Sequence, residues 1–281
     1  MPNRTSPAHD PLISFHEAEQ ILAVRIQREK TMKHLTLAAA LLAATAVAPT
    51  AFAQDSDISV STGVDYVTDY VFRGTSFGGA SVQPYAEASI GNFTVGGWFS
   101  AGMGESSFIN GDEFDLYAGY SVPLDGSISL DLGATYYHFP QGGSFLSTND
   151  GDSGAYEVSA SLGFGDLPLA PSVTAYYDFT FEALTLEAGV GHSFAIGDKQ
   201  SFDLGLTGGL VDVDGGSYEW ATASASIGHA FTDDVSAYIG ANYSVNSDKL
   251  LGGFDLDLDD LTTDDPSADL LWFGTGISAG F

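Results

Sequence analysis

Apolar and polar residues alternate along most of the chain from Ile58 onward. Between Ile58 and Phe72 the even positions carry Ile, Val, Thr, Tyr and Phe, whereas the odd positions carry mainly Ser, Gly, Val and Asp. Because a period of two places successive side chains on opposite faces of a β-strand, each such segment predicts a strand between an apolar and a polar medium. The pattern predicts twelve strands, over residues 58–73, 82–90, 93–103, 113–122, 128–136, 156–164, 173–181, 184–190, 202–210, 221–231, 235–245 and 271–281.

Two all-β folds contain many alternating strands, a soluble β-sandwich and a membrane β-barrel. The predicted strands are about ten residues long, the length that a tilted membrane-crossing strand needs. The polar face is rich in Gly, Ser, Thr, Asp and Glu, which suits a polar lumen better than a sandwich core. Aromatic residues gather toward strand ends, where interface girdles would lie, at Tyr70, Phe72, Tyr136, Tyr177, Phe179 and Tyr243. We therefore expect a transmembrane antiparallel up-and-down β-barrel of about 12 strands, with 10 to 14 as the range.

The predicted connections alternate between short and long. The short ones fall at residues 91–92, 123–126, 166–171, 195–199 and 232–234. The long ones fall at residues 74–80, 104–111, 140–154, 212–217 and 246–269, and a tight connection at 182–183 is the exception. Short periplasmic turns, long outer loops and an even strand count describe a bacterial outer-membrane protein. The last strand alternates up to a terminal aromatic residue, so we expect Phe273, Ile277 and Phe281 to form the signal read by the barrel-assembly machinery.

Residues 32–53 are typical of a secretory signal peptide. Lys33 and His34 precede an apolar run over residues 35–47, and Ala51 to Ala53 form a small-x-small cleavage site. The apolar run is too short for a stop-transfer helix, and the alternative is an Ala/Leu helix of a soluble domain. We expect translation to start at Met32, residues 1–31 to be an upstream extension, and residues 54–281 to form the barrel in the outer membrane.

The net charge of the chain limits the classes of molecule that it can bind. The formal net charge is −29, and five of the eight basic and four of the 37 acidic residues precede residue 54. The remaining part keeps only Arg73, Lys199 and Lys249 as basic residues, which excludes a nucleic-acid partner. The 19 Phe, 13 Tyr and three Trp argue against an acidic disordered chain. Because the chain has no Cys, thiolate catalysis and disulfides are excluded as well.

Three segments resemble the TorF family of proteobacterial porins. They are Asp69 to Ser76 (DYVFRGTS), Gly96 to Ser100 (GGWFS) and Glu113 to Tyr120 (EFDLYAGY), with Tyr136 to Pro140 and Tyr156-Glu157 similar to a later family segment. Residues 75–81 depart from the more usual polar, Gln-containing version of the family. The resemblance implies an outer-membrane β-barrel of the porin class and no particular solute.

Two motifs suggest other chemistry. Gly74 to Gly78 matches the G-x-S-x-G pattern of hydrolases, but that motif needs a following helix and a His and acid that serve Ser76. We interpret it as a chance match in a chain rich in Gly and Ser, and expect no enzymatic activity. The acidic segment with Asp255, Asp257, Asp259 and Asp260 offers carboxylates for Ca²⁺ without the glycine spacing of known calcium loops, so a solvated outer loop is the preferred interpretation. His138 and His192 share the parity of the apolar residues, so we expect them at the membrane interface.

The charged residues on the polar face are the candidate functional residues. By parity they are Asp65, Asp69, Arg73, Glu87, Glu113, Asp115, Asp131, Glu157, Asp178, Glu187 and Asp203. Carboxylates in a low-dielectric channel wall concentrate cations and repel anions, so we expect a passive channel for small cationic or neutral solutes, without a cofactor. Alternatives are a closed structural barrel whose acidic loops bind divalent ions or surface partners, and an outer-membrane hydrolase. The acidity could equally reflect a saline habitat. Lipid and lipopolysaccharide are the expected partners.

Overall fold

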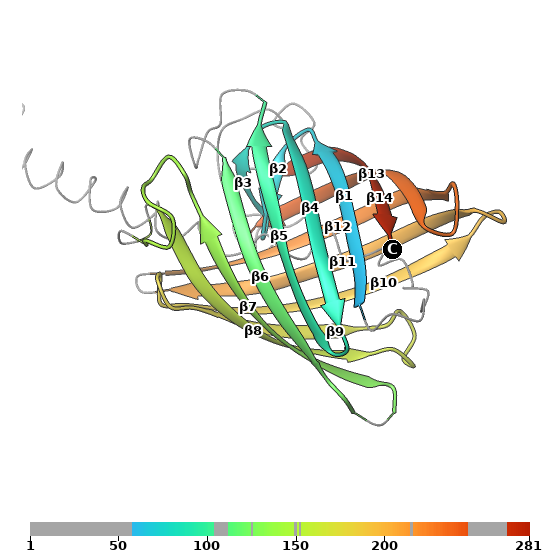
Figure 1. Cartoon of the computed structure of the whole chain (residues 1–281), viewed down its shortest axis with the longest axis horizontal. Helices are drawn as coiled ribbons and strands as arrows, with labels where there is room; N and C mark the ends of the chain where they lie inside the picture. The colour runs from blue at the N-terminus through green and yellow to red at the C-terminus, as the bar shows by residue number, and fades with distance from the viewer. Residues whose placement is uncertain are drawn as a thin grey trace, which may run out of the picture. The chain divides into compact units, whose positions relative to one another are not determined.

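The computed structural model describes residues 58–103, 112–124, 126–148, 151, 153–213, 216–246 and 269–281. The expected signal peptide, the expected start at Met32 and the acidic segment around Asp255 lie outside these residues. Figure 1 shows the described part as strands joined by turns and loops. The strands are β1 (Ile58–Val67), β2 (Tyr70–Phe72), β3 (Thr75–Gly78), β4 (Ser81–Ile90), β5 (Phe93–Gly102), β6 (Glu113–Val122), β7 (Ile128–His138), β8 (Gly154–Phe164), β9 (Ser172–Asp178), β10 (Ala183–Ala195), β11 (Gln200–Val213), β12 (Gly216–Ala230), β13 (Val235–Asn246) and β14 (Leu270–Gly280).

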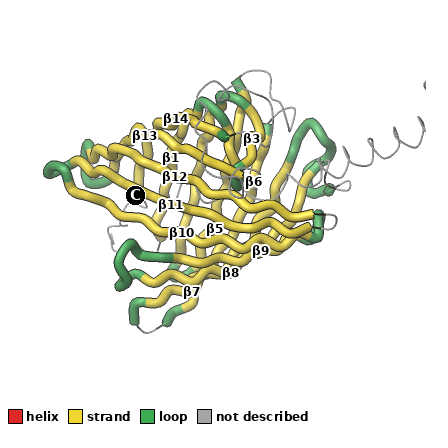
Figure 2. Tube along the Cα trace, turned by 180° about the vertical axis from the view of Figure 1, so that it is seen from behind, coloured by secondary structure: helices red, strands yellow, loops and turns green. Residues whose placement is uncertain are grey.

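Twelve of these strands form a closed antiparallel barrel. The ring runs β1-β4-β5 and then in sequence order to β14, which pairs with β1 again. At the seam, Val64 of β1 lies opposite Ile277 of β14, and on the other side of β1 Val67 lies opposite Ser81 of β4. The prediction of a twelve-stranded antiparallel up-and-down barrel is therefore confirmed; Figure 2 shows the ring from behind. Among the described residues, helices of the length and apolarity needed to cross a membrane are not found.

The two faces of the barrel wall differ in chemistry, as the alternation predicts. Large apolar side chains are exposed on the outer face, for example Val95 on β5, Leu206 on β11 and Ile239 on β13. The inner face carries small and polar residues, and its glycines make room for inward tyrosines. A Cβ on Gly63 would lie 2.6 Å from the Tyr85 ring. Small inner residues leave space inside the ring, while the apolar outer residues suit contact with lipid.

The two ends of the barrel differ in their connections. At the end that holds Ile58 and Phe281, here called the turn end, strands are joined by residues 91–92, 123–127, 165–171, 196–199 and 231–234. The last residue pairs there with the first strand, because Val60 N–H donates to Phe281 O at 3.0 Å and Phe281 N–H to Val60 O at 2.8 Å. The opposite end, here called the loop end, holds the longer connections 103–112, 139–153 and 247–269.

Three sequence predictions about the loop end are wrong. The first predicted strand, 58–73, ends at Val67, and the predicted loop 74–80 contains β3. The predicted loop 212–217 is mostly strand, because β11 and β12 pair as far as Val213 and Gly216. The strand predicted over 173–181 ends at Asp178. In the first and third cases the alternation continues after the chain has turned. In the second case pairing continues beyond the residues that alternate.

The predicted aromatic girdle is partly correct. Tyr177 and Phe179 are exposed on the outside as expected. Tyr136 is covered by the 139–153 connection, whose Ser147 carbonyl accepts a hydrogen bond from the Tyr136 hydroxyl at 3.3 Å. Tyr70 and Phe72 are each only 6% exposed and belong to the interior of the barrel, which overturns their assignment to the girdle.

Candidate functional site: an arginine-tipped hairpin inside the barrel

Strands β2 and β3 form a small hairpin that is separate from the barrel wall. They pair with each other only, with Phe72 opposite Thr75. The hairpin connects β1 to β4 and buries Tyr70, Phe72 and Phe77 in one cluster, against which Trp98 of β5 packs. Because Trp98 alternates with outward residues of β5, this cluster lies inside the ring. The segment between the first two wall strands therefore folds into the lumen.

The turn of the hairpin places Arg73 and Gly74 in the left-handed backbone region. Their φ angles are 42° and 76°. Two consecutive positive φ values define the tight hairpin turn that fits the twist of the flanking strands. Glycine adopts this conformation freely, but for Arg73 it is unfavourable and must be offset by contacts of the side chain.

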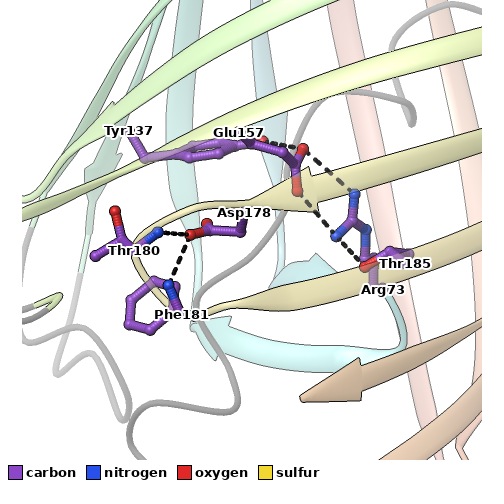
Figure 3. Close-up of polar contacts among 7 residues, drawn as sticks. All are labelled: Arg73, Tyr137, Glu157, Asp178, Thr180, Phe181 and Thr185. Atoms are coloured by element: carbon purple, nitrogen blue, oxygen red, sulfur yellow. Dashed lines mark hydrogen bonds and ion pairs between the residues drawn. The ribbon is translucent and has the colours of Figure 1, made fainter. Parts of the chain in front are cut away.

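The Arg73 side chain makes those contacts on the opposite wall, as Figure 3 shows. Nη1 lies 3.3 Å from Glu157 Oε2 on β8 and donates to Thr185 Oγ1 on β10 at 2.7 Å. The guanidinium also lies 4.3 Å from the ring centroid of Tyr176 on β9. Both charged side chains are almost fully buried, at 3% and 4% exposure. Burial by itself would lower the pKa of Arg73, but the combined interactions with Glu157, Tyr137, Tyr176 and Glu187 outweigh burial and raise this pKa.

These contacts cross the full width of the barrel. In the ring, β9 is the sixth strand from β1 in either direction, and β8 and β10 are its neighbours. The hairpin starts at β1 and its tip reaches the three strands that lie farthest from β1. It therefore bridges two opposite walls.

The sides of the hairpin also contact the wall. The Tyr70 hydroxyl donates to Glu113 Oε2 of β6 at 3.0 Å, and its ring lies 5.5 Å from that of Trp98. On the other side, a Cβ on Gly74 would collide with Cβ of Trp220 on β12 and lie 3.4 Å from Ser244 Oγ on β13. The hairpin thus approaches β5 and β6 on one side of the barrel and β12 and β13 on another.

Two further interior residues complete the Arg73 site. The Tyr137 hydroxyl donates to Glu157 Oε1 at 3.0 Å and fixes the carboxylate from β7. Tyr176 supplies the aromatic face under the guanidinium. The sequence interpretation did not single out either tyrosine or Thr185, although all three share the parity of the polar face.

The sequence-predicted charged residues all lie in the interior or at its edge. Each of the eleven is buried or half-buried: Asp65, Asp69, Arg73, Glu87, Glu113, Asp115, Asp131, Glu157, Asp178, Glu187 and Asp203. They fall into two groups. One surrounds the hairpin at the loop end, where Glu113, Asp115, Glu157 and Asp178 are buried; the other lies closer to the turn end.

Asp178 has a local structural contact besides its place near Arg73. Its Oδ1 accepts the backbone N–H of Thr180 at 2.7 Å and that of Phe181 at 2.9 Å. These bonds fix the tight connection between β9 and β10, in which Phe181 is buried and Glu182 has a φ of 53°. Figure 3 shows this turn beside the Arg73 site.

The acidic residues nearer the turn end are half-buried and bonded to hydroxyl groups. Glu87 accepts from Tyr117 at 3.2 Å, Asp131 from Ser121 at 2.6 Å, and Asp203 from Ser201 at 2.7 Å. In contrast to Glu157, none of these three contacts supplies a positive charge. These three carboxylates thus share the inner parity of the wall, and their partners in these contacts are neutral hydroxyl groups.

Ser76 lies in a setting unlike that of a hydrolase nucleophile. It is part of β3, its hydroxyl points to the carbonyl of Gly78 at 3.5 Å, and the next element is strand β4. A nucleophile elbow requires a strand, a sharp turn and a helix. The G-x-S-x-G match is part of the interior hairpin.

The histidines and the C-terminal residues lie on the outer side. His192 is exposed, whereas His138 is buried beneath the 139–153 connection, where Nδ1 lies 2.9 Å from Ser153 O. Phe273, Ile277 and Phe281 are exposed along the outer face and end of β14. The candidate calcium ligands Asp255, Asp257, Asp259 and Asp260 lie outside the described residues.

Fold and site together define a class: a closed antiparallel β-barrel with an apolar exterior and an arginine-tipped hairpin in its lumen. Residues 51–242 match the model of a family described as "Bacterial protein of unknown function (Gcw_chp)". The match covers more than half of the chain, and the chain belongs to this family. No curated protein shows significant sequence similarity.

Solved structures share the fold at very low sequence identity. The chain is similar to the KdgM porin, with 10% identity, a TM-score of 0.51, and 79% of this chain and 99% of the porin covered. It is likewise similar to the NanC porin, with 11% identity, a TM-score of 0.50, and 78% and 98% covered. An outer membrane channel from Pseudomonas putida F1 matches with 12% identity and a TM-score of 0.46, covering 86% of this chain and 100% of that one.

Proposed function

We propose that this protein is an outer-membrane channel that lets small solutes diffuse passively and prefers cations. The observation that carries the proposal is the closed twelve-stranded ring, with large apolar residues exposed outside and small, polar and acidic residues inside. Outer-membrane channels have this distribution because lipid surrounds the wall and water fills the lumen. The resemblance to TorF porins and the fold shared with two porins support the same class.

The outer face supports the membrane location. Exposed apolar side chains recur on nearly every wall strand, including Phe93, Leu132, Leu186, Leu204 and Ile277. A soluble protein rarely exposes a continuous apolar surface of this extent. A bilayer would cover it, with the connections of both ends in water.

The interior charges support the cation preference. Of the two basic residues in the described ranges, Lys199 is exposed in a turn-end connection and Arg73 is paired with Glu157. Asp65, Glu87 and Asp203 remain as half-buried interior carboxylates without such a partner among the contacts given above. In a wall of low dielectric constant they would raise the local concentration of cations.

Reversal potentials in a salt gradient test this proposal. Asp65→Asn and Glu87→Gln should each move the reversal potential toward that of a non-selective pore, whereas Asp198→Asn, on an exposed connection, should leave it unchanged. Unchanged selectivity in both interior variants would overturn the cation preference while leaving the channel itself intact.

A closed structural barrel is the second candidate, and the buried hairpin is the observation that favours it. In that case the acidic residues stabilise the interior or bind divalent cations and surface partners at the loop end. The enzyme alternative has weaker support, because Ser76 occupies the hairpin. Conductance of the intact protein and of a variant without the hairpin distinguishes a channel from a closed barrel.

A further inference from the structure

We propose that the β2–β3 hairpin is a movable plug that closes the channel at its loop end, and that the Arg73–Glu157 ion pair is the latch that holds it closed. The inference rests on the proposed channel function. It adds that the structure shows the closed state, and that the equilibrium between closed and open states depends on one buried contact.

The hairpin has the reach that a plug requires. Its tip contacts β8, β9 and β10 on the wall opposite its own attachment. Tyr70 contacts β5 and β6, and Gly74 approaches β12. Contacts on several sides leave the lumen occupied at this level.

The barrel wall does not depend on the hairpin. β1 and β4 pair with each other along their whole length, from Ile58 opposite Ile90 to Val67 opposite Ser81. The ring is therefore closed without β2 and β3. The hairpin could leave the lumen without breaking any pair of the wall.

The two segments that connect the hairpin to the wall, residues 68–69 and 79–80, suit a hinge. Thr68 is held by β14, with Thr68 N–H donating to Phe273 O and Phe273 N–H donating to Thr68 Oγ1, each at 2.9 Å. On the other side, Gly79 has open space, with no atom within 4 Å of the position of an added Cβ. One backbone hydrogen bond, from Tyr70 N–H to Gly79 O at 3.2 Å, joins the connectors. If the hairpin rotates out of the lumen, the backbone would thus turn just after the fixed Thr68 on one side and at the unhindered Gly79 on the other.

The Arg73–Glu157 latch is sensitive to the loss of either charge because both side chains are buried. A buried ion pair gains little net free energy over apolar packing, but removal of one partner leaves an uncompensated buried charge. The positive φ of Arg73 adds strain that only the docked state offsets. Neutralisation of either partner should therefore favour release of the hairpin, while the aromatic cluster of Tyr70, Phe72 and Phe77 opposes it.

Single-channel recordings of the protein purified from the outer membrane of an expression host test the latch. Glu157→Gln and Arg73→Gln should each raise the ratio of open to closed time by about a hundredfold or more. The double variant should open less often than either single variant, because it leaves no buried charge without a partner. Glu182→Gln is the matched control, since its exposed side chain lies at the same end of the barrel and undergoes the same chemical change.

A variant in which residues 69–79 are replaced by a short Gly-Ser linker separates the possible outcomes. Heat-modifiable migration on gels first establishes that each variant is folded. If the linker variant conducts continuously and the two latch variants open more often than the wild type, the plug and its latch are supported. If the linker variant conducts and the latch variants behave as the wild type, the latch is wrong. If the wild type already has the conductance of the linker variant, the hairpin is no plug. If every folded variant is silent, the channel proposal itself fails.

Discussion

Arg73 and Glu157 are 84 residues apart in the sequence and form an ion pair across the barrel interior, with Nη1 and Oε2 3.3 Å apart. One residue belongs to a hairpin that is free of the barrel wall, and the other to wall strand β8. The pair thus joins a detachable element to the fixed ring.

Loss of the pair should be visible in the backbone dynamics of the hairpin. In Glu157→Gln we expect amide hydrogen exchange of residues 70–78 to accelerate by about a hundredfold, because the buried guanidinium loses its counter-charge. Exchange in β11 and β12 should stay as in the wild type, as should the hairpin in Glu182→Gln. If the hairpin amides exchange at equal rates in the wild type, Glu157→Gln and Glu182→Gln, the aromatic cluster alone holds the hairpin in place.

Gly74 in the hairpin turn and Gly79 directly after β3 provide a matched pair of substitutions. Gly74→Ala should weaken docking by about 1–3 kcal/mol, because the residue has a φ of 76° and its Cβ would collide with Trp220. Gly79→Ala should change it by less than about 0.5 kcal/mol, because nothing surrounds that position. Hydrogen exchange of the hairpin measures both effects, and similar values for the two variants would contradict the docked geometry.

Asp178 should stabilise the β9–β10 connection. Asp178→Ala removes the acceptor of two backbone N–H groups, so we expect a loss of about 1.5–3 kcal/mol in the free energy of unfolding. Urea titration in lipid vesicles measures it, with Asp198→Ala in an exposed connection as the control. A loss no larger than that of the control would show that the bonds to Thr180 and Phe181 contribute nothing.

Neighbouring residues of β11 test the assignment of the two faces. Leu206 is exposed on the outer face near the middle of the strand, and Thr207 faces inward. In bilayers Leu206→Lys should cost about 2–4 kcal/mol, whereas Thr207→Lys should cost much less because the lumen is polar. Urea unfolding in vesicles of fixed composition provides the comparison. Equal costs would contradict the membrane-facing exterior.

Phe281 combines a backbone contact with an exposed ring. Its backbone pairs with Val60, and its side chain is 72% exposed. Phe281→Ala keeps the backbone pairing, so unfolding in vitro should change by less than about 0.5 kcal/mol. If Phe281 is part of the assembly signal, the amount of folded protein in the outer membrane of cells should fall severalfold. Normal assembly in cells would exclude that role.

The alternation of residues predicted the wall well because each wall strand separates two media. Leu204 and Leu206 lie on the outer face with Asp203 and Thr207 on the inner, as parity requires. The same rule placed the charged residues in the interior. Alternation does not predict the position of each side chain along the barrel axis. It also does not predict which residue a side chain contacts across the lumen.

The hairpin was missed for a physical reason. Tyr70 and Phe72 continue the parity of β1 after the chain has turned at Thr68 and Asp69, so the pattern shows no break. Their apolar side chains face the interior because the hairpin carries its own apolar cluster there. Parity placed Arg73 in the interior, but it could not identify Glu157 on β8 as the partner of Arg73. Asp69 to Ser76, one of the segments that resemble the TorF family, forms most of this hairpin.

The most direct test of the channel is single-channel conductance in planar bilayers under a salt gradient, measured on the folded wild type and on the variant with residues 69–79 replaced. We expect discrete conductance steps with a cation-selective reversal potential, rare in the wild type and sustained in the variant. Silent bilayers for both proteins, with gel migration that shows folded barrels, would contradict the channel and favour a closed structural barrel.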